Sequence, residues 1–311
     1  MIETCQNKEV KTRTQEDFKL NVFPRLPPAR PRDWGAGMTI CIAAIAKDDA
    51  IVVTSDLMAS AVSFSADKVM AKAMRVASHW WVMFSADDTS YVTAVHDRVL
   101  NLLQSTDNVF SNVRSTFVRA YLEERQNQAE HQVLGGYNLS MERFLRENTQ
   151  MFTAEESRDL YTRIKYIRLG CSLLAFGFDK FNIAHIFEVS EDVNGDVSDK
   201  VMDNIGFWAI GSGQYSALSI LFFHEYSRTK ELTTAIYRVA EAKFMAESAQ
   251  GVGKYTLMGI FKPDLHASFL GYAKLDEIRA KWQAEGAPRT PKNIEKFIEG
   301  MISWRELQPW D

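Results

Sequence analysis

The sequence contains little cysteine, glycine or proline, and it has no long apolar run and no block of charges of one sign. Its 311 residues include 16 glycines, 8 prolines and 3 cysteines. This composition excludes collagen-like and low-complexity chains. Cys5, Cys41 and Cys171 lie too far apart for a CxxC metal site or a disulfide framework, which is typical of a reducing compartment. We therefore expect a cytoplasmic protein.

The charges nearly balance. Lys and Arg number 36 against 40 Asp and Glu, for a net charge of -4. Without a basic run, the chain is not suited to neutralise a phosphate backbone, and we expect no nucleic-acid partner. No segment approaches the roughly 20 apolar residues of a membrane span, and the N-terminal segment has no signal-peptide core. We expect no membrane association, and a hydrophobic content of 46% predicts a sizeable core.

The beginning of the chain differs from the rest. Residues 1–38 are polar and lack a helical or strand period, and Pro24, Pro27, Pro28 and Pro31 fall within them. Such a segment buries too little apolar surface to offset its ordering entropy, so we interpret it as a disordered leader or a misassigned translation start. Residues 39–273 are predicted to form one domain, and residues 274–311 a helical tail.

The apolar pattern alternates between strand and helix character. Segments with strand character occupy residues 40–46, 51–54, 68–76, 80–84, 171–179, 182–190, 206–213 and 255–263, with VNGDV (193–197) as a turn between the sixth and seventh segment. The run 80–84 is apolar throughout, as expected for a strand covered on both faces. Amphipathic periods predict helices within 89–166, 214–250 and 275–285, and another helix with Thr290 as its N-cap. Gly135 and Gly136 should interrupt the first helical block, and Thr153 with Glu156 forms a capping box in it.

This order of strands, helices, strands, helices and strand predicts an α+β fold. Two sheets between two helical layers would produce it, so we expect a four-layer αββα sandwich with an extra helical insertion and C-terminal helices. General enzyme motifs are absent: the sequence contains no HExxH, GxSxG, Walker loop or GxGxxG. The six histidines never fall at metal-ligand spacing, and we expect neither a metal nor a cofactor.

One region carries a family pattern. In MTICIAAIAKDDAIVVTSD (38–56), Thr39 opens one strand and Asp56 closes the next. They are followed by a loop of small residues, by Lys72, and by the strand and turn WWVMFSADDTSYV (80–92). A GSG element follows much later, at 211–213. This pattern resembles the proteasome β-subunit family of the N-terminal-nucleophile hydrolases, over about two thirds of the chain. The resemblance implies a set of site residues: Thr39 as nucleophile, Asp56, Lys72 and Ser212 in support, backbone donors at Ser85, Ala86 and Asp87, and Glu247 and Gln250 in looser positions.

Elementary chemistry explains these residue types. A Thr hydroxyl is a weak nucleophile until a base takes its proton, and an N-terminal Thr carries its own base, an α-amine with a reference pKa of about 8. A lysine ammonium nearby lowers the pKa of that amine and stabilises the developing alkoxide, and a carboxylate holds the lysine in place. The structural alternatives are an ordinary strand threonine, a strand-end turn aspartate and a solvated edge-strand lysine.

The sequence as written places Thr39 inside the chain, where its nitrogen is an amide and not a base. Translation from Met38 followed by methionine removal would free it; self-cleavage of the Met38–Thr39 bond is the second route, although Gly37 stands one position too early for the family pattern. The resemblance implies an amide-bond hydrolase, with peptides as first substrate candidates, that self-associates; we make no prediction of an ATPase partner. The alternatives are an inactive scaffold subunit and, from GSG and GVG alone, a nucleotide-binding protein.

Overall fold

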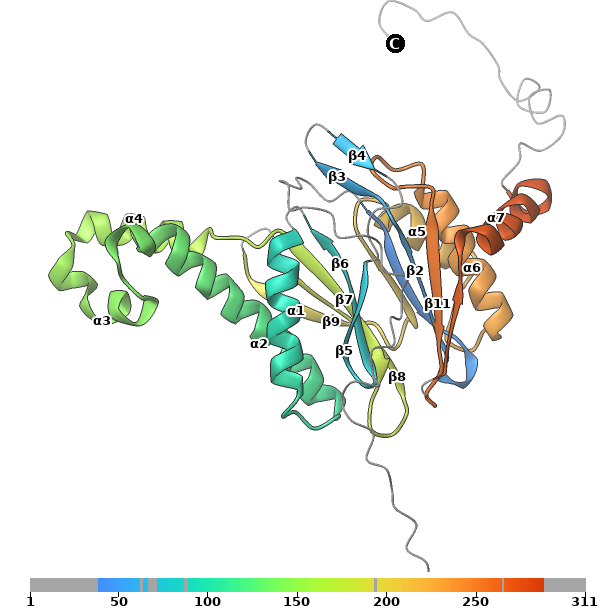
Figure 1. Ribbon diagram of the computed structural model, residues 1–311, viewed down its shortest axis with the longest axis horizontal. Helices are drawn as coiled ribbons and strands as arrows, with labels where there is room; N and C mark the ends of the chain where they lie inside the picture. Colours follow the sequence, from blue (N-terminus) through green and yellow to red (C-terminus); the bar gives the residue numbers. More distant parts are fainter. Residues whose placement is uncertain are drawn as a thin grey trace, which may run out of the picture.

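The structure is a computed structural model that describes residues 39–61, 64–66, 72–86, 89–192, 195–264 and 266–287. The predicted leader 1–38 and the predicted helix that begins at Thr290 lie outside these ranges. Among the described residues, the chain forms an α+β fold with two five-stranded antiparallel sheets (Figure 1).

The first sheet is built around the predicted N-terminal hairpin. Its strands, in spatial order, are β10 (Phe207–Ile210), β1 (Cys41–Ile45), β2 (Ile51–Asp56), β11 (Thr256–Phe261) and β12 (Ala267–Leu270). The hairpin prediction is confirmed, because β1 pairs with β2 from Cys41 opposite Ser55 to Ile45 opposite Ile51. The connecting turn η2 (Lys47–Asp49) contains aspartates in the left-handed region, which Asp tolerates better than most residues.

The second sheet joins strands from both halves of the chain. It runs β5 (Ala73–Ala77), β6 (Trp80–Ala86), β7 (Cys171–Phe178), β8 (Ala184–Glu191) and β9 (Val197–Val201). A separate two-stranded ribbon, β3 (Ala59–Ala61) with β4 (Phe64–Ala66), occupies part of the segment where we expected only a loop.

The two sheets pack face to face, and helices cover their outer faces. Alternate residues of β1 show this directly: Cys41, Ala43 and Ile45 belong to the apolar cluster between the sheets, whereas Ile42 and Ala44 belong to the cluster under the helices. A strand exposes alternate side chains on opposite faces, so burial of both sets means that the sheet is covered on both sides. This is the reason why the strand is apolar throughout.

Each outer face carries its own helical layer (Figure 1). The first sheet is covered by α5 (Gln214–Phe223) and α6 (Leu232–Ala246), with α7 (Tyr272–Lys281) and the turn η5 (Trp282–Gly286) packed against α6. The second sheet is covered by α1 (Thr89–Leu103) and α2 (Phe110–Ala129). The element order in the sequence therefore predicted the layers correctly.

The helical insertion extends away from the sandwich in Figure 1, and we call residues 130–167 the arm. After α2, it consists of η3 (Glu130–Leu134), η4 (Gly135–Tyr137), α3 (Met141–Met151) and α4 (Ala154–Lys165). The α-helix ends at Ala129, before the predicted glycine pair; the π-helical turn η3 follows it, and Gly135 and Gly136 open the 3-10 turn η4. The predicted capping box is present, since Thr153 Oγ1 accepts from the Glu156 amide at 3.3 Å and the Glu156 carboxylate accepts from the Thr153 amide at 2.9 Å.

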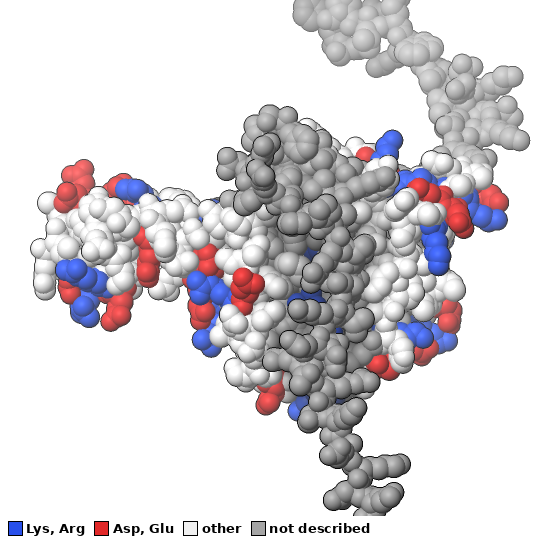
Figure 2. Space-filling view, in the orientation of Figure 1, with Lys and Arg blue, Asp and Glu red and all other residues white. Residues whose placement is uncertain are grey.

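The arm has a small core and a charged surface. Five buried side chains form a cluster separate from the other three: Val133, Leu134, Leu139, Phe144 and Leu160. Figure 2 shows cationic and anionic side chains mixed along its surface. Ion pairs one helical turn apart, such as Arg143–Glu147, join them.

One connection was predicted wrongly. The turn near residues 193–197 does not lead to the strand at 206–213; β9 intervenes, pairs with β8 and forms the edge of the second sheet. Its sequence VSDKV is mostly exposed and polar, as edge strands are, so it lacks the apolar run that marks the buried strands. In the described ranges, no helix has both the length and the apolar character that crossing a membrane requires.

Candidate active site

Three predicted site residues meet where the ends of the two sheets come together. Thr39 lies just before β1, Asp56 is the last residue of β2, and Lys72 lies just before β5 of the other sheet. The antiparallel hairpin brings the start of β1 and the end of β2 side by side, because its register pairs Cys41 with Ser55. Lys72 comes from the opposite sheet and reaches across the gap between them.

The three side chains form a closed set of contacts. The Thr39 hydroxyl donates to Asp56 Oδ1 at 2.6 Å, and Lys72 Nζ donates to the same oxygen at 2.7 Å. Lys72 Nζ also donates to Thr39 Oγ1. All three are buried, with 2%, 0% and 5% of the surface of Thr39, Asp56 and Lys72 exposed. A hydroxyl is thus held directly against an ammonium group in a low-dielectric setting, where electrostatic interactions are strong.

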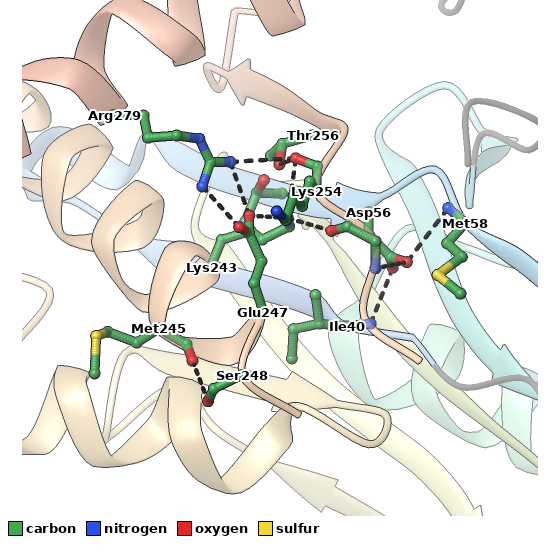
Figure 3. A network of polar contacts seen from close by, with 12 residues as sticks. Ile40, Asp56, Met58, Lys243, Met245, Glu247, Ser248, Lys254, Thr256 and Arg279 are labelled. Atoms are coloured by element: carbon green, nitrogen blue, oxygen red, sulfur yellow. Dashed lines mark hydrogen bonds and ion pairs between the residues drawn. The ribbon is translucent and has the colours of Figure 1, made fainter. Parts of the chain in front are cut away.

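Backbone amides complete the environment of the Asp56 carboxylate. Besides the side-chain donors, Oδ1 accepts from the Ile40 amide at 3.0 Å, and Oδ2 accepts from the amides of Met58 at 3.3 Å and Gly253 at 3.1 Å. Figure 3 shows this carboxylate between Ile40 and Met58. A buried carboxylate is tolerated when it is paired and hydrogen-bonded, and Asp56 has both kinds of partner.

The GSG element holds the backbone of Thr39. Gly211 has φ +101°, and a Cβ at this position would collide with the Thr39 carbonyl, so both the conformation and the close approach require glycine. The Gly213 amide donates to that carbonyl at 3.3 Å, and the Ser212 hydroxyl donates to it at 3.4 Å and to the Gln250 carbonyl at 3.0 Å. Ser212 and Gln250 therefore lie at the site, the latter through its main chain.

Glu247, which the family pattern matches only loosely, takes part in ion pairs with two cations. Its carboxylate binds Lys243 Nζ at 2.5 Å and accepts two bonds from the Arg279 guanidinium at 2.7 and 2.8 Å. Glu247 thus lies in an ion-pair network with buried Lys243 and partly exposed Arg279, close to the Asp56 carboxylate (Figure 3). Sequence reasoning missed Lys243 and Arg279. The signal that could have found the first is a single lysine inside the apolar segment AEAKFMA of α6.

Two of the three residues expected in an oxyanion turn lie in a strand. Ser85 and Ala86 are the last two residues of β6 and pair with Ser172 and Cys171 of β7, so they belong to a strand and not to a turn. The strand continues to Ala86 because β6 stays paired with β7 over its whole length. Asp87 lies outside the described residues.

Cys41 is the other potential nucleophile near the site. Its Sγ donates to the Phe84 carbonyl at 3.5 Å. Burial raises the pKa of the Cys41 thiol to about 12, although the positive charge of Lys72 opposes part of this rise. A thiol in this state is protonated at neutral pH and unreactive. In the described ranges, no group of three His, Cys, Asp or Glu side chains is placed to hold a metal ion.

No family model matches the chain, and a search of curated proteins finds no match. The interpretation of the site therefore depends on the residues and their geometry.

Proposed function

We propose that the chain is a threonine-type N-terminal-nucleophile hydrolase that cleaves an amide bond, most simply a peptide bond, through an acyl-enzyme. The observation that carries the proposal is the buried contact set of Thr39, Asp56 and Lys72, in which a hydroxyl lies against an ammonium group fixed by a carboxylate. A threonine with only a structural role does not need a buried lysine on its hydroxyl, because a buried charge is expensive to maintain.

The proposed reaction begins with Thr39 at the N-terminus. Its Oγ attacks the carbonyl carbon of the substrate amide, and the hydroxyl proton passes to the α-amine. When the carbon–nitrogen bond breaks, the leaving amine takes this proton and an ester of Thr39 remains. Water then gives a proton to the α-amine and attacks the ester, which releases the acid and restores the hydroxyl. Lys72 stabilises the negative charge on Oγ, and Asp56 holds Lys72.

The reaction requires removal of residues 1–38. We favour translation from Met38 with loss of that methionine, since a small residue follows it. In the second route, Thr39 Oγ attacks the Met38 carbonyl, the acyl group moves from nitrogen to oxygen, and water cleaves the resulting ester. Both routes produce the same chain, beginning at Thr39.

We further propose that the fold belongs with the proteasome β-subunit-like members of this class. Two features support the proposal: two antiparallel sheets packed between helical layers, and a GSG element that holds the backbone of the threonine. The arm is an addition to the compact family pattern, and a family relationship would imply self-association.

The alternative is a scaffold subunit without activity. It is favoured by the burial of Thr39, which is 2% exposed in the chain as written and has an amide in place of an amine. A substrate must reach Oγ, so an intact leader on the native protein would favour the scaffold.

The first experiment measures the intact mass and N-terminal sequence of the protein from its native host. A chain that begins at Thr39 is then treated with peptide vinyl sulfones, which add to a nucleophilic oxygen, and the modified residue is mapped by mass spectrometry. We expect labelling at Thr39 and none in Thr39→Ala. Thr54→Ala is the matched control, since Thr54 is equally buried on β2 but its hydroxyl binds the Leu257 carbonyl. A native chain that retains Met1 or Met38 would refute the hydrolase.

A further inference from the structure

Lys243 is a buried lysine on α6 with 0% of its surface exposed. Its Nζ donates to the Gly253 carbonyl at 2.7 Å and lies 2.5 Å from Glu247 Oε1. Burial lowers the pKa of Lys243, while the carboxylates of Glu247 and Asp56 oppose this shift. The lysine therefore interacts electrostatically with the candidate site without touching Thr39 or Lys72.

Gly253 connects the two groups. Its carbonyl accepts from Lys243, and its amide donates to Asp56 Oδ2 at 3.1 Å. A shift of this residue would therefore change a hydrogen bond to the carboxylate that binds both Thr39 and Lys72. Displacements of about 1 Å at a reacting group can reduce rates by about 100-fold.

The outer part of the network comes from α7. Arg279 binds both oxygens of Glu247, donates to the Lys254 carbonyl at 3.2 Å, and stacks over Phe244 with 4.2 Å between its Cζ and the ring centroid. The turn between α6 and β11 is thus held by a cation from each of two helices (Figure 3).

We infer that Lys243 is a positioning residue for the active site, acting on Asp56 through Gly253, and that Arg279 on α7 supports it by fixing Glu247. The catalytic part of this inference rests on the proposed function. A buried ion pair is weak support for stability, since apolar residues of similar volume often stabilise a protein equally well. Fixing the donor to Asp56 gives the buried charge a role that an apolar residue could not fill.

The first test does not depend on activity. Hydrogen–deuterium exchange of the Gly253 amide is measured by NMR in the full chain and in Lys243→Met, which keeps the length of the side chain and removes the charge. We expect exchange to accelerate at least about tenfold. Arg238→Met is the matched control, because Arg238 also lies on α6 and pairs with a buried glutamate, Glu241, at 2.6 Å. It should leave Gly253 unchanged.

The second test separates positioning from binding. With a peptide vinyl sulfone as probe, Lys243→Met should lower the limiting labelling rate of Thr39 by about 100-fold and leave the half-saturating probe concentration unchanged. Arg238→Met should alter neither. An unchanged limiting rate, or a change in half-saturation alone, would overturn the inference.

A second variant tests the same inference if Lys243→Met does not fold. Arg279→Gln changes a partly exposed residue, and it should accelerate Gly253 exchange by a smaller factor in the same direction. Unchanged exchange in the folded variants, or equal acceleration in Arg238→Met, would overturn the inference. If the wild-type chain begins at Thr39 and the probe does not react, the proposed hydrolase fails, whereas Gly253 exchange still decides whether Lys243 holds Asp56.

Discussion

Substitution of Lys72 by Met should destabilise the protein whether or not it is an enzyme. Lys72 Nζ lies 2.7 Å from Asp56 Oδ1 in a buried pair. At an effective dielectric constant of about 20, charges at this separation attract by about 6 kcal/mol, which the desolvation of two ions largely offsets. Removing one partner loses the attraction but leaves the other ion buried, which typically destabilises by about 3–5 kcal/mol. Backbone donors still bind Asp56, so we expect about 3 kcal/mol.

Urea unfolding followed by tryptophan fluorescence measures this loss. The matched control is Lys47→Met, since Lys47 pairs with Glu231 at the similar distance of 2.6 Å, but both side chains are more than half exposed. Surface pairs contribute little, so the control should unfold at an unchanged urea concentration.

The result that would refute this reasoning is a loss below about 1 kcal/mol in Lys72→Met, which is typical of an exposed pair.

Three further outcomes are expected. Trp81→Ala should destabilise the protein by about 4 kcal/mol in the same urea assay, because this ring is buried between the sheets. Gly211→Ala should abolish vinyl sulfone labelling of a chain that begins at Thr39, since the added Cβ meets the Thr39 carbonyl. Hydrogen bonding from Arg143 holds the pKa of Glu147 below its usual 4.5. A carboxyl group whose pKa is lowered by folding stabilises the folded state at pH values above its pKa in the unfolded chain. This stabilisation is lost as the pH falls through the pKa of the folded state. Circular dichroism should therefore show a small loss of helix in the arm on acidification below about pH 4.5, of the size that one exposed pair can cause, and this loss should be reduced in Arg143→Gln.

Each of these predictions has its own control. Trp81→Phe keeps a ring in the core and should retain most of the stability. Gly136→Ala adds a methyl group to open space and should leave labelling intact. Arg158→Gln, a change elsewhere in the arm, should leave the acid transition of the wild type unchanged. Labelling in Gly211→Ala, or equal acid transitions in Arg143→Gln and the wild type, would contradict the stated causes.

The buried strands were predictable from the sequence, and so were the edge strands β5 and β10, whereas the edge strands β9 and β12 were not. β1, β2 and β6 are covered on both faces, so each contains an unbroken apolar run: all of β1, the first three residues of β2 and the first five of β6. In contrast, β9 and β12 lie at sheet edges, are short and carry exposed residues, so nothing in their composition distinguishes them from loops.

The candidate site shows the same limit. Thr39, Asp56 and Lys72 could be singled out because the sequence pattern around them resembles a known family, and the structure brings them into contact. The partnership of Glu247 with Arg279 spans 32 positions and depends on how α7 packs against α6. Such a contact is decided by tertiary packing, which no local spacing encodes.

The arm also has a thermodynamic consequence. Its five-residue core is separate from the other clusters, and none of the seven tryptophans lies within it. A small separate core should melt independently of a larger one, so the total heat absorbed in a calorimeter should exceed the van't Hoff enthalpy derived from the shape of the fluorescence transition. The chain then has two melting temperatures, and tryptophan emission reports only the one that belongs to the sandwich.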